Sequence, residues 1–220
     1  MKVQWIRKRG AGALLVLFDG WGMDFQRLPE WSEKLSGIDF LAVSDYTSSA
    51  FPEISDAAGY RSCTVLAWSL GVWSFAASRL SDRLPPGPRI ALNGTLTPIS
   101  EQTGIPEAVF RGTGENWLEE RARKKFLLRM TGSDKAVSGR SPEDQKTELE
   151  ALAERIGGLP VPSNPYGIAF CGRRDRIFPF PAQKRFWETR PETELRERDW
   201  LHDPSGAPDF FEEVRRNAVL

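Results

Sequence analysis

One pentapeptide, Ala67-Trp68-Ser69-Leu70-Gly71, constrains the fold of this chain more than any other segment. An apolar, β-favouring run leads into it and a helix-like segment follows it. A serine at such a strand–turn–helix is typical of a nucleophile elbow, where the residues two before and two after the serine must be small. Ala67 and Gly71 meet this requirement, although alanine replaces the usual first glycine. The same letters also fit a buried helix, VLAWSLGVWSFAA, in which Ser69 is only a small packed residue.

The only histidine of the chain favours the first interpretation. A serine hydroxyl needs a neighbouring base at neutral pH, and that base is nearly always an imidazole held by a carboxylate. His202 is therefore the candidate base for Ser69. Taken alone, His202 also fits an ordinary loop near the C-terminus.

The acid of this triad is predicted at Asp175, between the serine and the histidine. Residues 166–172 read as a short buried strand ending in a glycine turn, and a proline after Asp175 opens a helix. The order of serine, acid and histidine is the one that α/β-hydrolases use. Asp175 alone is also compatible with a turn-capping role. Asp199 and Asp203 lie too close to His202 along the chain to supply the usual third member.

A glycine-flanked turn, Gly20-Trp21-Gly22, follows an early hydrophobic strand at 13–18. The oxyanion hole of α/β-hydrolases combines the amide after the nucleophile with an amide from the loop after an early strand. These are the backbone N–H groups of Leu70 and Trp21, and the glycines allow an amide to point inward. The alternative is an ordinary glycine-rich β-turn.

Three segments together resemble a known family: 18–24 (FDGWGMD), 67–73 (AWSLGVW) and 172–175 (GRRD). They are similar to the pimeloyl-[acyl-carrier protein] methyl ester esterase family of the BioG type, and the similarity runs over nearly the whole chain. The resemblance implies a short α/β-hydrolase of biotin synthesis. Its expected reaction is hydrolysis of the distal methyl ester of pimeloyl-acyl carrier protein methyl ester, with acyl carrier protein (ACP) as the partner.

The triad itself does not select the substrate. A serine esterase or thioesterase for another short acyl substrate has the same catalytic residues. A non-catalytic relative that binds an acyl carrier is an alternative from another class. We expect no cofactor, and a single histidine argues against a histidine-based zinc site.

Strand–helix alternation predicts a single domain over residues 1–220 with the α/β-hydrolase fold, a mostly parallel central sheet with helices on both faces. Residues 4–8 and 13–18 read as paired strands around a glycine-rich turn. Further strands are expected at 40–44 and 89–92. A helix is expected to begin near Asp24.

Residues at about 97–160 interrupt this alternation. They are polar, with helix-like stretches at 117–130 and 142–156, and the second stretch opens with Ser141 as N-cap and Pro142 at the first helical position. An insertion between the later strands forms a lid over the serine in α/β-hydrolases. We therefore predict a helical lid here, with a plain helical crossover as the alternative.

Candidate binding residues cluster in and near this segment. Arg121, Lys125 and Arg129 are spaced by four and share one helix face, which is either simply solvated or, given the resemblance, docks an acidic carrier or its phosphopantetheine phosphate. Three aromatic residues are candidate walls for the acyl chain: Trp68, Trp73 and Phe126. At least one of these three is expected to be only a core residue.

The charge balance excludes some partners. Thirty Lys and Arg residues match thirty Asp and Glu residues, which argues against nucleic acid or an anionic membrane as a partner. No apolar run reaches membrane-spanning length and the N-terminal residues lack a signal peptide's hydrophobic region, so we expect a cytoplasmic protein. A monomer is the expected oligomeric state. Cys63 and Cys171 read as buried thiols of a reducing compartment, and the sequence leaves a disulfide between them open.

Overall fold

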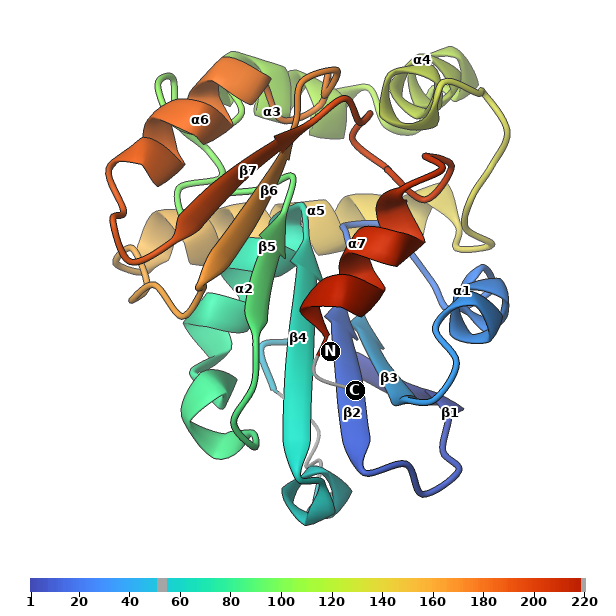
Figure 1. Cartoon of the computed structure of the whole chain (residues 1–220). Helices are drawn as coiled ribbons and strands as arrows, with labels where there is room; N and C mark the ends of the chain where they lie inside the picture. The colour runs from blue at the N-terminus through green and yellow to red at the C-terminus, as the bar shows by residue number, and fades with distance from the viewer. Residues whose placement is uncertain (51–54, 219–220) are drawn as a thin grey trace.

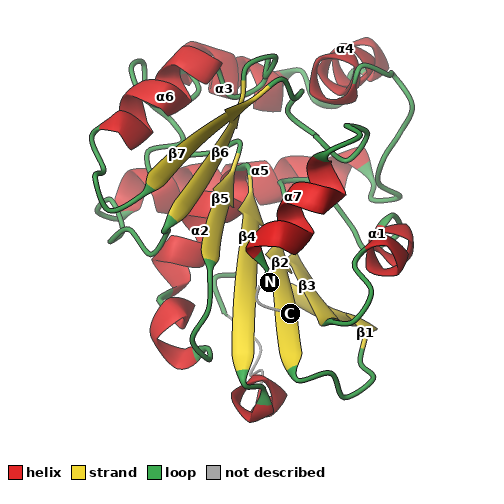
Figure 2. Ribbon diagram, viewed as in Figure 1, coloured by secondary structure: helices red, strands yellow, loops and turns green. Residues whose placement is uncertain are grey.

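The computed structural model describes residues 1–50 and 55–218. Within them, seven strands form one sheet in the order β1-β3-β2-β4-β5-β6-β7 (Figures 1 and 2). The strands are β1 Lys2–Arg7, β2 Ala13–Phe18, β3 Asp39–Ser44, β4 Ser62–Trp68, β5 Arg89–Leu92, β6 Ile168–Gly172 and β7 Glu194–Arg198. β1 runs antiparallel to β3 and all other neighbours are parallel, which confirms the predicted mostly parallel sheet.

Helices cover both faces of this sheet. They are α1 Leu28–Lys34, α2 Leu70–Ser78, α3 Glu107–Glu115, α4 Glu120–Thr131, α5 Pro142–Gly158, α6 Phe180–Glu188 and α7 Phe210–Asn217, with 3-10 turns at Ser55–Gly59 and Leu80–Arg83. Alternate residues of β2 enter two separate apolar clusters, as the period of a strand requires. One cluster contains residues of α2, α5 and α6 and the other those of α1 and α7. Figure 1 accordingly shows α7 in front of the sheet and α5 behind it.

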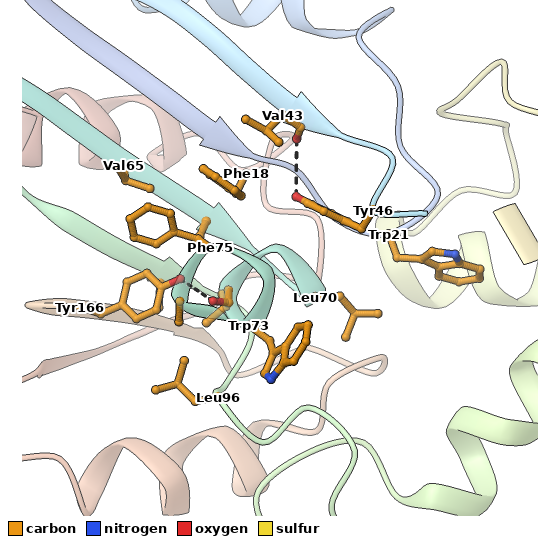
Figure 3. Packing of buried hydrophobic residues seen from close by; sticks show 14 of the residues in the cluster. Phe18, Trp21, Val43, Tyr46, Val65, Leu70, Trp73, Phe75, Leu96 and Tyr166 are labelled. Carbon is orange, nitrogen blue, oxygen red and sulfur yellow. Dashed lines mark hydrogen bonds between the residues drawn. The ribbon is translucent and has the colours of Figure 1, made fainter. Parts of the chain in front are cut away.

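Helix α2 is buried along its first seven residues, 70–76, and lies in the middle of one cluster (Figure 3). The ring centroids of Phe18 and Phe75 are 4.9 Å apart. The hydroxyl of Tyr166 donates to the carbonyl of Val72 at 2.6 Å. A helix that is apolar on all sides is stable only when it is enclosed in this way. The packing therefore fixes the start of α2, which lies directly after Ser69.

The predicted pairing of the first two strands is wrong. β1 pairs with β3, while β2 lies between β3 and β4. All six residues of β2 are buried, so this strand needs a parallel neighbour on each side and helices on both faces, whereas β1 is half exposed at the sheet edge. The loop between them is held by Asp39 of β3, whose carboxylate accepts the amides of Arg9 and Gly10 at 2.8 and 3.0 Å.

Several other boundaries differ from the sequence prediction. The helix expected from Asp24 begins at Leu28, with Pro29 in its first turn, where a missing N–H costs nothing. α3, β7 and α7 were not predicted. The start of α5 is as expected, because the Ser141 hydroxyl accepts the amide of Asp144 at 3.1 Å.

The segment 97–160 contains α3, α4 and α5. Figure 1 shows α3 and α4 beyond the carboxyl ends of the strands, while α5 passes along the sheet. Leu149 and Leu152 of α5 belong to the same apolar cluster as α2. No helix in residues 1–50 and 55–218 is long and apolar enough to cross a bilayer.

Both cysteines are free and buried, so the disulfide that the sequence left open is absent. Burial raises the pKa of the Cys63 thiol to about 11 and also raises that of Cys171. Across the two described ranges, no group of three or more His, Cys, Asp and Glu side chains is arranged to hold a metal ion.

Candidate active site

Ser69 occupies the sharp turn between β4 and α2. Its backbone angles, φ 58° and ψ −126°, are rare for a residue with a side chain and cost about 1–3 kcal/mol. The Ser69 amide donates to the carbonyl of Leu92 at 2.9 Å, which ties the turn to the end of β5. A Cβ at Gly71 would lie 2.4 Å from the carbonyl oxygen of Phe18, so only glycine allows α2 to pass β2 this closely. The turn has the geometry that the elbow motif predicts.

The structure brings the three predicted triad residues together. His202 Nε2 lies 2.9 Å from Ser69 Oγ, and His202 Nδ1 lies 2.8 Å from Asp175 Oδ2. All three side chains are buried, and Ser69 is 6% exposed. With the Nδ1–H tautomer, Nδ1 donates to the carboxylate and Nε2 accepts from the hydroxyl, which is the arrangement that a general base needs.

The Asp175 carboxylate is held by donors besides His202. Its Oδ1 accepts the amides of Ile177 and Phe178, each at 2.8 Å. Its Oδ2 accepts the side-chain amide of Gln183 on α6 at 2.9 Å. Gln183 is completely buried and was not predicted, because only the packing of α6 on the sheet brings it to the carboxylate. These bonds fix the carboxylate that orients the imidazole.

Two further side chains hold the loop that carries His202. The side-chain amide of Asn93, just after β5, donates to the carbonyls of Leu201 and His202 at 2.9 and 2.8 Å. The indole N–H of Trp68 donates to the His202 carbonyl at 2.8 Å. Asn93 was not singled out from the sequence, although a polar residue at the carboxyl end of a parallel strand is a usable signal.

The amides of Trp21 and Leu70 are available for an oxyanion. In the part of the chain that the structure describes, neither amide donates to another residue. Leu70 is the first residue of α2, whose N–H has no partner within the helix and carries the positive end of the helix dipole. The amides on either side of Trp21 are occupied, because Gly20 N–H donates to Asp19 and Gly22 N–H to Glu148.

An apolar pocket opens over Ser69 and His202. Its cavity volume is about 50 Å³. Apolar side chains from the loop after β2, from the segment 97–160 and from the segment after Asp175 contribute to its wall: Trp21, Ile105, Phe110, Phe126, Met130, Leu149 and Ile177. A mostly apolar wall beside Ser69 suits a hydrocarbon chain better than a polar substrate.

Of the three residues predicted to line the acyl pocket, two line it and one does not. Phe126 lines the pocket and packs edge-on against Trp21, with ring centroids 5.6 Å apart. Trp68 also lines it, with its ring 5.3 Å from that of His202. Trp73 does not line the pocket, because the inward face of α2 turns it into the core, where Figure 3 draws it with Leu96.

The three predicted docking residues lie along one groove. Arg121, Lys125 and Arg129 of α4 line a surface groove between α3 and α4, with a cavity volume of about 490 Å³. Arg129 also lines the pocket over Ser69, as does Arg176. The groove and the pocket share Arg129, so a cationic side chain lies where the two adjoin.

A buried ion network lies against Trp68, one of the residues that line the pocket, and was not predicted. Arg27 donates to Asp19 Oδ1 at 2.7 Å and to Asp203 Oδ2 at 2.5 Å. Its guanidinium also lies 4.8 Å from the ring of Trp68. Burial raises the pKa of Asp19, and the charge of Arg27 opposes that rise. Asp19 precedes the Trp21 loop and Asp203 follows His202, so Arg27 connects the two loops.

Comparison with known proteins identifies the family of this chain. The sequence profile of the family described as Pimeloyl-ACP methyl esterase BioG matches residues 1–203. A malonyl-[acyl-carrier protein] O-methyltransferase of Bacteroides fragilis (strain 638R) is 35% identical over 181 residues, covering 79% of this chain and 36% of that protein. The chain thus spans about a third of the methyltransferase's length.

Solved structures agree with this assignment. The crystal structure of selenomethionine BioG from Haemophilus influenzae superposes with a TM-score of 0.78 and 28% identity, covering 92% of this chain and 94% of that one. The esterase EaEST from Exiguobacterium antarcticum has a TM-score of 0.71 at 13% identity, covering 97% and 92%, and shows the fold alone. The chain has the α/β-hydrolase fold and belongs to the pimeloyl-ACP methyl esterase BioG family.

Proposed function

We propose that this protein hydrolyses the distal methyl ester of pimeloyl-ACP methyl ester, giving pimeloyl-ACP and methanol in the cytoplasmic synthesis of biotin. The observation that carries the proposal is the hydrogen-bonded chain from Ser69 through His202 to Asp175 at the base of an apolar pocket. Membership of the BioG family supports the choice of substrate.

In the acylation step, His202 Nε2 takes the proton of the Ser69 hydroxyl while Oγ attacks the carbonyl carbon of the methyl ester. Asp175 holds the Nδ1–H tautomer and stabilises the imidazolium that forms. When the tetrahedral intermediate collapses, the bond to the methoxy oxygen breaks. His202 gives its proton to that oxygen, and methanol leaves.

In the deacylation step, His202 takes a proton from water as the resulting hydroxide attacks the acyl carbonyl. The bond to Ser69 Oγ then breaks, and Oγ regains the proton from His202. The product is a free distal carboxylate with the thioester to the carrier intact. The amides of Trp21 and Leu70 hold the oxyanion in both steps, and loss of one such donor typically raises the barrier by about 3 kcal/mol.

The apolar pocket supports an acyl chain as the substrate's body. Phe126 and Trp68 contribute to its wall, and a chain of methylene groups gains about 0.8 kcal/mol for each group buried. The helices α3 and α4, within residues 97–160, act in this proposal as the lid that keeps water from the acyl chain.

The basic groove supports a carrier protein as the partner. Arg121, Lys125 and Arg129 present cations along it, and Arg129 reaches the pocket that contains Ser69. An acidic carrier docked there, as a partner of a monomeric esterase, delivers its phosphopantetheine arm toward the serine. Electrostatic attraction of this kind mainly raises the association rate and weakens with salt.

Mass spectrometry of methyl-pimeloyl-ACP, incubated with the wild type and with Ser69→Ala, tests the proposal. The expected result is loss of one methyl equivalent with the thioester retained, in the wild type only. Release of the whole acyl chain would identify a thioesterase. A substrate left unchanged by the wild type would point to another short ester or to a non-catalytic carrier-binding protein. Equal loss of the methyl group with wild type and Ser69→Ala would assign the nucleophile to another residue.

A further inference from the structure

A buried carboxylate outside the triad lies on α5. Glu148 is completely shielded from solvent, and the reaction mechanism does not use it. Its Oε1 accepts the amide of Tyr46 at 2.9 Å and its Oε2 accepts the amide of Gly22 at 3.1 Å. Arg140 forms an ion pair with the same carboxylate. Burial raises the pKa of Glu148, while these partners favour its ionised form.

A second polar side chain of α5 binds the same loop. Gln145 precedes Glu148 by three residues and therefore lies on the same face of the helix. Its Nε2 donates to the carbonyl of Gly22 at 2.8 Å, and its backbone carbonyl accepts the indole N–H of Trp21 at 2.7 Å. Its Oε1 accepts the indole N–H of Trp117 at 3.0 Å, so the amide cannot rotate without losing a bond.

The other side of the loop is held from the sheet. The Asp19 carboxylate accepts the amide of Gly20 at 2.9 Å. The hydroxyl of Tyr46 donates to the Asp19 carbonyl at 2.6 Å. Of the three consecutive amides from Gly20 to Gly22, only that of Trp21 has no acceptor within residues 1–50 and 55–218.

We infer that Glu148 and Gln145 are positioning residues that hold the Trp21 amide in the oxyanion hole. The inference rests on the proposed function, because it takes this amide as an oxyanion donor. It also divides the segment 97–160 into two parts. α5 is a fixed support of the active site, and only α3 and α4, which precede it, act as the proposed lid.

The physical reason lies in the composition of the loop. Glycines on both sides of Trp21 allow many backbone conformations, and Gly22 has a φ of 75° that other residues rarely adopt. An oxyanion donor lowers the barrier only when it already points at the developing charge before the reaction. The bonds from α5 remove the freedom that the glycines create.

Two variants of α5 and one control test this inference. Glu148→Gln keeps the size of the side chain but places an NH2 group against an amide N–H that needs an acceptor. Gln145→Met keeps the volume and removes the bond to the Gly22 carbonyl. Glu150→Gln makes the same chemical change on the same helix, where the side chain is 64% exposed, and should leave the kinetics unchanged.

Hydrolysis of a p-nitrophenyl alkanoate is measured with active sites counted by titration. Both positioning variants should lower kcat by about 10- to 100-fold with KM changed little, as expected for an oxyanion donor displaced by a fraction of an ångström. Inhibition by an alkyl trifluoromethyl ketone, whose serine adduct carries an oxyanion, should weaken by the same factor. A merely structural role would lower the count of active sites and leave both constants of the remaining sites unchanged.

The inference is overturned if folded Glu148→Gln keeps the wild-type kcat, or if ketone inhibition is unchanged while kcat falls. If Glu148→Gln fails to fold, kcat and ketone inhibition of Gln145→Met test the inference instead, with the same outcomes overturning it. A wild type that cleaves p-nitrophenyl esters but not methyl-pimeloyl-ACP would refute only the proposed substrate, since the comparison of variants does not involve the carrier. A wild type without any esterase activity would refute the proposed function and this inference together.

Discussion

Replacement of Gly71 by alanine tests the close approach on which the elbow depends. A Cβ at this position would lie 2.4 Å from the carbonyl oxygen of Phe18 and 2.6 Å from that of Asp19. Both are backbone atoms at the end of β2, so neither can rotate away as a side chain would. Gly71→Ala therefore requires α2 or the end of β2 to move by about 0.6 Å to reach even a tight contact of 3.0 Å.

Two effects follow from this movement. Overpacking in a rigid core typically costs about 1–3 kcal/mol, and in a protein of this size that corresponds to a fall in Tm of about 2–12 °C. The displaced atoms directly precede the loop that contains Trp21, and they lie beside the Leu70 amide. A misplacement of about 1 Å can cost roughly 100-fold in rate, so kcat/KM should fall by more than the fraction unfolded explains.

Thermal unfolding and steady-state ester hydrolysis, measured on the same preparations, give both quantities. Gly157→Ala is the matched control, because its Cβ meets nothing within 4 Å and it lies in the last turn of α5. Its Tm should be unchanged or raised, since alanine is the better helix former. Wild-type Tm and kcat/KM in Gly71→Ala would refute the close approach, and with it the geometry of the elbow.

Three further substitutions have defined outcomes. Asp175→Asn should keep the fold but lower kcat by about 10,000-fold, because the amide stabilises the wrong imidazole tautomer, and unchanged kinetics would assign the acid to another residue. Arg27→Met should lower the free energy of unfolding, measured by urea denaturation near neutral pH, by about 3–5 kcal/mol, since it leaves two buried carboxylates without their cation; unchanged stability would contradict that pairing. Burial would raise the pKa of Asp45, but hydrogen bonds from Lys2 and Thr47 outweigh it and lower the pKa from 3.8 to about 2. The stability that ionised Asp45 contributes to the fold is therefore fully present above pH 3.8 and is lost as the pH falls toward 2. Asp45→Asn should then be less stable than the wild type at neutral pH and equally stable in strong acid. A stability difference that persists in strong acid would contradict this sign.

Local sequence patterns were sufficient to predict the three residues that the fold brings together at the candidate active site. Ser69 lies between an apolar strand and an apolar helix, and the chain offers one histidine. Asp175 follows a short buried strand at a turn. The three therefore fall in a known order, and the fold then brings their side chains within hydrogen-bond distance.

The residues that support the site were missed because their partners are distant in sequence. Glu148 bonds to amides more than 100 residues away, and in a helix rich in charged residues it looks like any exposed glutamate. The sequence did contain one signal that the two polar residues are buried, because Gln145 and Glu148 lie on the same helix face as Leu149 and Leu152. The pairing of β1 with β3 was missed for the same reason, because adjacent strands suggest a hairpin unless burial shows that β2 lies inside the sheet.

Labelling with an alkyl fluorophosphonate, followed by mass spectrometry of the peptides, tests the central claim of a serine nucleophile most directly. The account predicts one adduct on Ser69, formed faster in the wild type than in Asp175→Asn and slowed by methyl-pimeloyl-ACP. Ser69→Ala should form none. An adduct on another residue, or no adduct on a protein that still hydrolyses esters, would contradict it.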